Sequence, residues 1–133
     1  MKRLFFIFLV LVMLSLMILP AVATETTIQP RWTYLSSVSA ALDINWLGVA
    51  SCSGQGFVQS SDKIEVVVIL QQYNNTGWVT LKSWSSTGTT TALASGQYAV
   101  ARGYTYRVNV FAYVYDSDGN IIESGSSSQT RVF

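Results

Sequence analysis

The sequence predicts an all-β protein, an antiparallel sandwich of about seven strands that forms a single domain over residues 31–133. Three observations predict it. Beyond residue 30 there is no long apolar stripe with the period of a helix, and apolar residues alternate with polar ones instead. β-branched and aromatic residues are frequent within these runs. Short stretches rich in Gly, Ser and Asn separate the runs at the spacing typical of a sandwich.

An export signal is predicted ahead of this domain. Lys2 and Arg3 form a positively charged start, and residues 4–19 form an apolar run interrupted only by Ser15. This run is shorter than the about 20 residues that a membrane-spanning helix needs. We therefore expect residues 1–23 to be a signal peptide, with membrane contact only before cleavage.

The cleavage site is expected after Ala23. Pro20 breaks the helix, and Ala21 and Ala23 supply the small residues that a signal peptidase prefers. Residues 24–30 then form an extended leader. The mature protein is expected to be secreted and extracellular.

The first two strands are predicted at residues 33–46 and 48–58. In the first, Val38, Leu42 and Ile44 share one face, as period-two alternation requires. The second contains three glycines, which indicate a bulge or a close approach of the backbone to a neighbouring layer.

The third and fourth strands are predicted at residues 63–73 and 78–84. The third is the most apolar segment of the domain, and the turn residues at 74–77 separate it from the fourth.

The last three strands are predicted at residues 89–100, 104–115 and 121–131. Gly103 introduces the sixth strand, and residues 116–120 (DSDGN) have the composition of a hairpin loop into the seventh.

Two of these strands resemble immunoglobulin-like domains, specifically fibronectin type III domains. Leu42-Asp43-Ile44-Asn45-Trp46 is similar to their L-x-V-x-W strand, and residues 103–112 (GYTYRVNVFA) to their G-x-x-Y-x-V-x-V-x-A strand. The resemblance implies that Tyr106 forms the tyrosine corner of such domains. The chain lacks a proline before Gly103 and has an additional glycine-rich strand around Cys52.

The chain also resembles a family of small, uncharacterised secreted proteins of Gram-positive bacteria, a domain of unknown function. The similar parts are Trp32-Thr33-Tyr34, residues 64–71, Gly77-Trp78 and Gly103-Tyr104-Thr105-Tyr106. The resemblance implies an extracellular sandwich and no particular activity.

The composition excludes several kinds of chemistry. The chain has no histidine and one cysteine, which removes Ser-His-Asp triads, Cys-His dyads and four-ligand zinc sites. Its 8 basic and 7 acidic residues form no basic footprint, so nucleic acid is not an expected partner. Cys52 is interpreted as a buried strand residue, with a reactive thiol or an intermolecular bridge as the alternative. No cofactor is expected.

The loop at residues 116–120 offers a calcium hypothesis. Asp116, Asp118 and Asn120 carry oxygen ligands, although the spacing does not fit an EF-hand. The alternative is a hairpin turn in which Asp118-Gly119 adopts positive φ angles.

A binding surface is predicted on the outward face of the third and sixth strands. Val67 and Ile69 alternate with the core positions of the third strand, and Phe111, Tyr113 and Tyr115 do so in the sixth. If the two strands are neighbours, these side chains form an apolar and aromatic patch, which usually has a partner. Arg107 and Glu65 would lie at its polar edge. The alternative is that residues 31–35 or the C-terminal tail cover it.

Trp78 and Trp84 form a second candidate platform. At a spacing of six they share one face of a regular fourth strand, and aromatic rings stack on sugar faces. Core packing is the favoured role for at least one of them.

These features favour a secreted, non-enzymatic binding or adhesion module. Its partner would be a protein or a glycan at the cell exterior. One alternative is a small extracellular hydrolase that uses paired carboxylates. Another is a self-assembling secreted factor in which the third strand pairs between chains, which requires that strand to lie at a sheet edge.

Overall fold

Seven antiparallel strands form the domain, as the sequence predicts. The structure is a computed structural model that describes residues 31–60 and 62–133, which belong to one compact unit, Arg31–Phe133. The strands are β1 (Leu35–Ile44), β2 (Val49–Val58), β3 (Lys63–Tyr73), β4 (Trp78–Thr89), β5 (Thr91–Ala99), β6 (Thr105–Tyr115) and β7 (Ile121–Val132). The predicted signal peptide and leader, including Ala21 and Ala23, lie outside the described residues. No described segment is a helix that could cross a bilayer.

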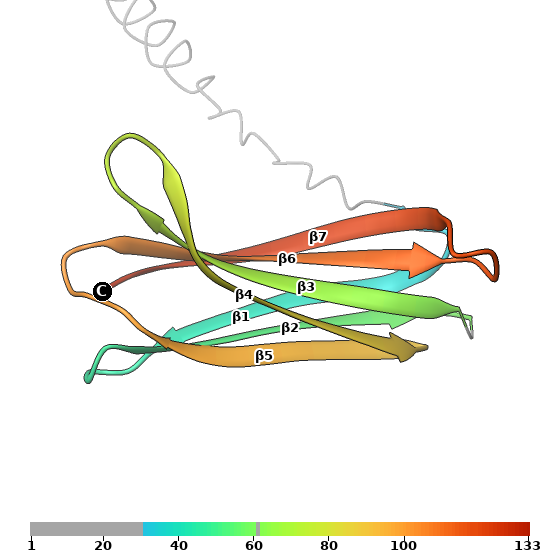
Figure 1. The fold of residues 1–133 in the computed structure, drawn as a ribbon, viewed down its shortest axis with the longest axis horizontal. Helices are drawn as coiled ribbons and strands as arrows, with labels where there is room; N and C mark the ends of the chain where they lie inside the picture. The colour runs from blue at the N-terminus through green and yellow to red at the C-terminus, as the bar shows by residue number, and fades with distance from the viewer. Residues whose placement is uncertain (1–30, 61) are drawn as a thin grey trace, which may run out of the picture. The chain divides into compact units, whose positions relative to one another are not determined.

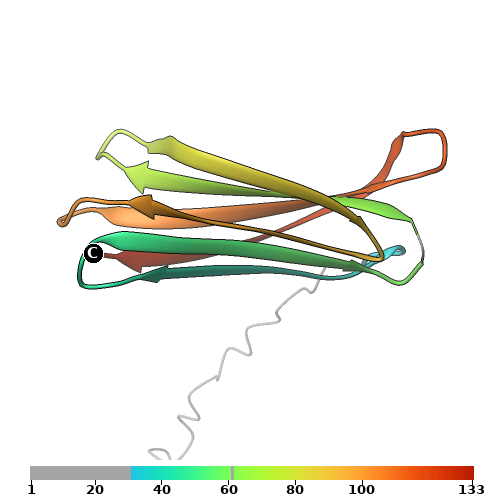
Figure 2. The same cartoon turned by 60° about the horizontal axis from the view of Figure 1, so that its bottom comes forward.

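The strands form two sheets that pack face to face (Figures 1 and 2). The smaller sheet has the order β1-β2-β5, and the larger one has the order β4-β3-β6-β7. The chain passes between the sheets after β2, β4 and β5. β3 and β6 are therefore neighbours at the centre of the larger sheet, which is the pairing that the predicted patch requires.

The core lies between the sheets and follows the alternation of β3 and β6. The inward residues of both strands are fully buried: Ile64, Val66, Val68, Leu70, Tyr106, Val108, Val110, Ala112 and Val114. Small residues of the opposite sheet, such as Ala50, Ala92 and Ala94, complete it. This strict alternation fixes the register, because a slip of one residue would expose every core side chain.

Side chains of β7 close the edge of the sandwich at β1. The Glu123 carboxylate accepts hydrogen bonds from the backbone amides of Thr33 (2.6 Å), Tyr34 (2.8 Å) and Leu35 (2.6 Å). Further along, Gln129 Oε1 accepts one from the Leu42 amide at 2.6 Å. These side chains satisfy backbone donors of β1, an edge strand without a strand partner on that side, and of the two residues before it.

Tyr106 ties the connection between β5 and β6 to the core. Its ring is fully buried, and its hydroxyl donates a hydrogen bond to the Ala101 carbonyl oxygen at 2.6 Å. Gln72 Nε2 donates to the same hydroxyl at 3.1 Å. The hydroxyl group thereby fixes the backbone that leads from β5 into β6.

Candidate binding surface

The predicted patch lies together on the outer face of the larger sheet. Val67 pairs with Phe111, and the neighbouring pairs place Glu65 opposite Tyr113 and Lys63 opposite Tyr115. We call Val67, Ile69, Phe111, Tyr113 and Tyr115 the outer strip. All five side chains are half-buried, because each is flanked by its neighbours on the sheet but is not covered by a second layer.

Hydroxyl side chains flank the outer strip on both sides. The outward residues of the edge strands β4 and β7 are exposed and almost all Ser or Thr: Ser83, Ser85, Thr87, Thr89, Ser124, Ser126, Ser128 and Thr130. Because these hydroxyl side chains are small, the aromatic rings of β6 project further from the sheet than the side chains of β4 and β7 do. The face therefore presents an apolar ridge between two rows of hydrogen-bonding groups.

A fixed positive charge lies at one end of the outer strip. The Arg107 guanidinium lies 4.0 Å from the centre of the Trp78 ring, a cation–π contact. Gln71 Oε1 accepts from Arg107 Nε (3.1 Å) and Nη2 (2.7 Å), and also from Asn109 Nδ2 (2.9 Å). These contacts hold the guanidinium plane in one orientation before any partner binds.

The opposite end of the outer strip carries charges of both signs. The Tyr115 hydroxyl donates to Glu65 Oε2 at 3.4 Å, and Lys63 Nζ lies 5.4 Å from the centre of the Tyr115 ring. Desolvation, and then the charge and hydrogen bond of Glu65, raise the pKa of Tyr115 above its ordinary value. Tyr115 therefore presents a neutral hydroxyl.

Residues 31–35 and the C-terminal tail are the two segments that could cover the outer strip, and their aromatic side chains pack elsewhere. Trp32 packs against Gly125, an inward position of β7 opposite the buried Ala112. Phe133 lies against Gly48 and stacks with Arg102 beyond the ends of the strands. Among the described residues, neither aromatic side chain lies over the outer strip.

The structure separates Trp78 from Trp84, so the predicted common platform is wrong. A β-bulge leaves Leu81 as an extra residue, because Leu70 pairs with Lys82 and Gln71 with Thr80. The bulge reverses the alternation of β4. Trp78 therefore faces outward beside Arg107, whereas Trp84 pairs with Val68 and packs against the core.

Gly96 explains why Trp84 fits between the sheets. A Cβ atom at Gly96 would lie 2.1 Å from Trp84 Cε2 and Nε1. The indole thus occupies the space that any other residue at this position of β5 would fill. Trp84 therefore packs in the core, which is the role favoured for at least one of the two tryptophans.

Asp116, one of the three residues of the calcium hypothesis, uses its carboxylate to accept hydrogen bonds from its own loop. Asp116 Oδ1 accepts hydrogen bonds from the backbone amides of Asp118 (3.0 Å) and Asn120 (2.8 Å), and Gly119 has a φ of +83°. The hydrogen bond from Asn120 contributes most to lowering the pKa of Asp116. Residues 116–120 therefore form a hairpin turn closed by Asp116. In the described part of the chain, no three His, Cys, Asp or Glu side chains are grouped to hold a metal ion.

Cys52 is a buried strand residue, as its main interpretation predicts. It lies on the inward face of β2 and is 2% exposed. Burial raises the pKa of its thiol to about 11. A thiol with this pKa is a poor nucleophile at neutral pH.

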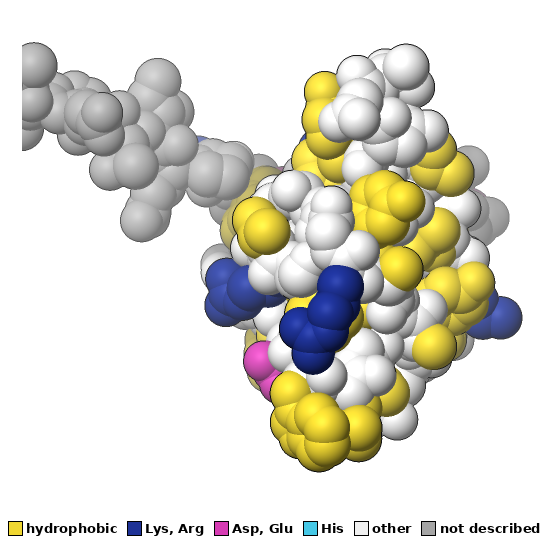
Figure 3. Space-filling model, turned by 90° about the vertical axis from the view of Figure 1, so that its left-hand side faces the viewer, with side chains coloured by type: hydrophobic (Ala, Val, Ile, Leu, Met, Phe, Trp, Pro, Cys, Tyr) yellow, Lys and Arg dark blue, Asp and Glu magenta, His cyan; other side chains and the backbone are white. Residues whose placement is uncertain are grey.

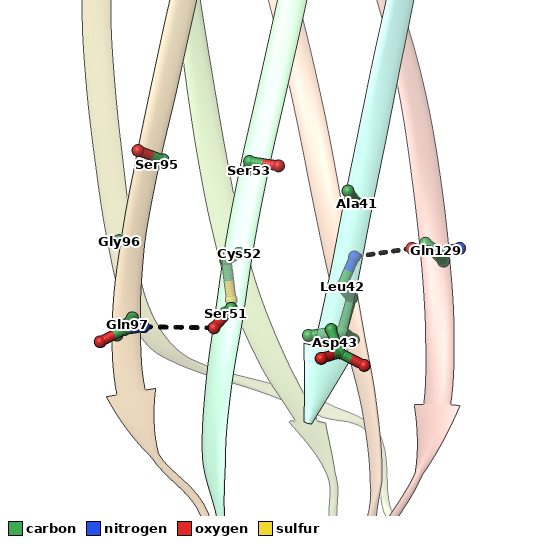
Figure 4. A pocket seen from close by; sticks show the side chains of 10 residues that line it. All are labelled: Ala41, Leu42, Asp43, Ser51, Cys52, Ser53, Ser95, Gly96, Gln97 and Gln129. Carbon is green, nitrogen blue, oxygen red and sulfur yellow. Dashed lines mark hydrogen bonds between the residues drawn. The ribbon is translucent and has the colours of Figure 1, made fainter. Parts of the chain in front are cut away.

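A shallow pocket lies on the smaller sheet, and no pattern in the sequence predicts it. It has a volume of about 520 Å³ and lies over the outward Ser51, Ser53 and Ser95, with Asp43 and Gln97 at its rim (Figure 4). Small outward residues at paired positions of three adjacent strands make the hollow. Those positions become adjacent only through strand pairing, and Asp43 is the one carboxylate in the lining.

The position of β3 removes the proposed route to self-assembly through that strand. β3 pairs with β4 on one side and with β6 on the other, so both of its hydrogen-bonding edges are occupied.

Comparison with known proteins gives no match to any protein-family model and none to a curated protein.

Proposed function

We propose that the protein is a secreted, non-enzymatic binding module whose outer strip docks onto a partner at the cell exterior. The observation that supports this is the half-exposed row of Phe111, Tyr113 and Tyr115 beside Val67 and Ile69. Aromatic side chains bury a large area with little loss of conformational entropy, which suits them to binding surfaces.

The chemistry of the face favours a glycan over a protein of the cell exterior. The aromatic side chains of the central strands offer apolar contact to sugar rings, and the Ser and Thr rows on both sides offer donors and acceptors to sugar hydroxyls. Arg107, held against Trp78, would accept a carboxylate or phosphate on such a polymer. The outer face of a sheet suits an extended chain that lies across the strands.

A hydrolase that uses paired carboxylates has less support. Two acidic side chains are occupied by backbone amides, Asp116 in its turn and Glu123 at the β1 edge. The pocket on the smaller sheet contributes only Asp43, whereas glycoside hydrolysis needs two carboxyl groups about 5–9.5 Å apart.

The proposal is tested by binding to cell-wall, glycan and host-surface fractions. The protein is expressed as the full chain, purified as the host processes it, and used in pulldown and calorimetry. Phe111→Ser and Tyr113→Ser together should weaken binding at least tenfold and leave the circular dichroism spectrum unchanged. The matched control is Leu93→Ser, an exposed apolar position on the outer face of the smaller sheet.

Two results would overturn the proposal. Wild-type binding that the double variant retains would place the ligand on another surface. Loss of the folded spectrum in the double variant would show that the outer strip is internal to the folded protein. Capture of a protein instead of a glycan would keep the surface and correct the class of ligand.

A further inference from the structure

The two ends of the sandwich carry opposite charge. We call the half that contains the β1–β2 turn, the β3–β4 turn and the C-terminus the basic end, and the other half the acidic end. The basic end carries four basic side chains against one acidic one: Lys82, Arg102, Arg107 and Arg131 against Asp43. The acidic end carries five acidic side chains against two basic ones: Asp62, Glu65, Asp116, Asp118 and Glu123 against Arg31 and Lys63.

The basic end also displays the most exposed tryptophan of the domain. Trp46 and Leu47 lie at the tip of the β1–β2 turn with 78% and 67% of their surface exposed. Figure 3 looks onto this end and shows hydrophobic side chains at its lower and upper parts, Lys and Arg side chains between them, and little acidic surface.

Hydrogen bonds hold the β1–β2 turn in one conformation. Asn45 Oδ1 accepts from the amides of Leu47 (3.1 Å) and Val49 (3.0 Å). Gly48 has a φ of +84°, and its carbonyl accepts from the Val100 amide at 2.8 Å. The Trp46–Leu47 pair is therefore presented on an ordered support, which lowers the entropy lost when a partner covers it.

Arg102 joins this turn to the rest of the basic end. Its Nη2 donates to the Trp46 carbonyl oxygen at 2.6 Å, and its guanidinium lies 4.4 Å from the centre of the Phe133 ring. The positive charge therefore lies directly beside the exposed apolar pair.

The acidic end has apolar surface of its own. Ile121 and Ile122 follow the Asp116–Asn120 turn and are exposed, as is Tyr34 at the start of the domain. Each end thus combines apolar side chains with charge, and the two charges are of opposite sign.

We propose that the protein associates with copies of itself head to tail, with the basic end of one copy seated on the acidic end of the next. Trp46 and Leu47 would cover the exposed isoleucines Ile121 and Ile122, while Arg102 and Arg131 approach Asp116 and Asp118. A second copy is the partner that fits both ends at once, because like ends repel and unlike ends attract. The two surfaces lie at opposite ends of the strands, so the contact is heterologous and builds an open chain of molecules.

The association is measured by sedimentation equilibrium over a range of protein concentrations at low salt. The full chain is used as the host processes it, with two variants that each block one end, Trp46→Ser and Ile121→Ser. Wild type should grow in mass with concentration, and each variant alone should associate at least tenfold more weakly. An equimolar mixture of the two variants should form dimers and nothing larger, because one intact contact remains. Ser126→Ala, on the outer face of the larger sheet, is the neutral control.

Charge reversal supplies a second set of variants. Arg131→Glu and Asp118→Lys change exposed side chains without entering the core, and each should weaken association at low salt. Association of wild type should also weaken as salt rises from 50 to about 500 mM, because exposed charges are screened over roughly 10 Å at 0.1 M.

The outcomes separate this proposal from its rivals and from the outer-strip proposal. Monomeric wild type at every concentration overturns it, and so does a mixture of the two blocked variants that stays monomeric. Assembly by Ile121→Ser but not by Trp46→Ser would indicate a symmetric contact between basic ends and would also overturn it. Binding of monomeric wild type to anionic phospholipid vesicles, lost in Trp46→Ser, would assign the basic end to membranes instead. None of these results depends on Phe111 or Tyr113.

Discussion

The Glu123 carboxylate accepts a 2.6 Å hydrogen bond from the backbone amide of Leu35, which connects the last strand of one sheet to the first strand of the other. The same carboxylate also accepts hydrogen bonds from the backbone amides of Thr33 and Tyr34. One side chain therefore orders the segment through which the chain enters the domain and brings Trp32 against Gly125.

Glu123→Gln should destabilise the fold by about 1–3 kcal/mol, because hydrogen bonds to a charged acceptor are stronger than those to a neutral amide. In a domain of this size that corresponds to a fall in Tm of roughly 4–8 °C per kcal/mol. Thermal unfolding of the variant against Ser124→Ala, an outward neighbour without such bonds, measures it. Equal Tm values for the two variants would show that the three amides are satisfied by water.

Stability should also depend on the protonation of Glu123. Desolvation raises the pKa of Glu123, but the three backbone amides outweigh it and the pKa lies below its ordinary value. The folded state then binds fewer protons than the unfolded state. The stabilisation is complete above the unfolded pKa and is lost as pH falls through the folded pKa. Urea unfolding between pH 7 and pH 3 should show a smaller loss of stability for Glu123→Gln than for wild type.

Tyr106→Phe should cost about 1–3 kcal/mol, because it removes a donor from the Ala101 carbonyl oxygen without changing the shape of the core. Equilibrium unfolding in urea measures this loss. The matched control is Tyr104→Phe, whose exposed ring lies nearby and whose hydroxyl makes no hydrogen bond within the described residues. If both variants lose the same stability, the bond to Ala101 contributes nothing specific.

Gly96→Ala should destabilise the sandwich by about 1–3 kcal/mol, because the added methyl group enters the space that the Trp84 indole occupies. Trp84→Phe in the same chain should recover part of that loss, since a smaller ring leaves room for the methyl group. A double-mutant cycle measures the coupling between the two positions. Additive effects of the two substitutions would contradict the close packing of Trp84 on Gly96.

The strands could be predicted from the sequence because alternation carries the information along each strand. From Ile64 to Leu70 and from Tyr106 to Val114 the core positions recur at every second residue, and the structure buries those positions as predicted. The outer strip follows from the same pattern, since the positions between the buried ones must face outward.

The features that the sequence does not predict depend on how the strands pair and where they end. The bulge at Leu81 is defined by two residues of β4 facing one of β3, and nothing in the local sequence marks it. Trp78 and Trp84 are therefore predicted to share a face that the structure does not give them. The first strand is predicted to reach Trp46, whereas β1 ends at Ile44 because the Asn45 side chain accepts from two amides and closes a turn. That difference moves Trp46 from a strand to an exposed tip and reveals the basic end.

Cys52 should resist thiol reagents while the protein is folded. Burial raises the pKa of its thiol to about 11, so little thiolate exists at pH 7.5, and the side chain is shielded within the core. Labelling with a chromogenic disulfide should be at least a hundredfold slower in buffer than in denaturant. A Cys52→Ala/Ser53→Cys variant moves the thiol to the adjacent outward position and should react quickly without denaturant. Rapid labelling of folded wild type would mean that β2 opens readily, and would return Cys52 to consideration as an intermolecular bridge.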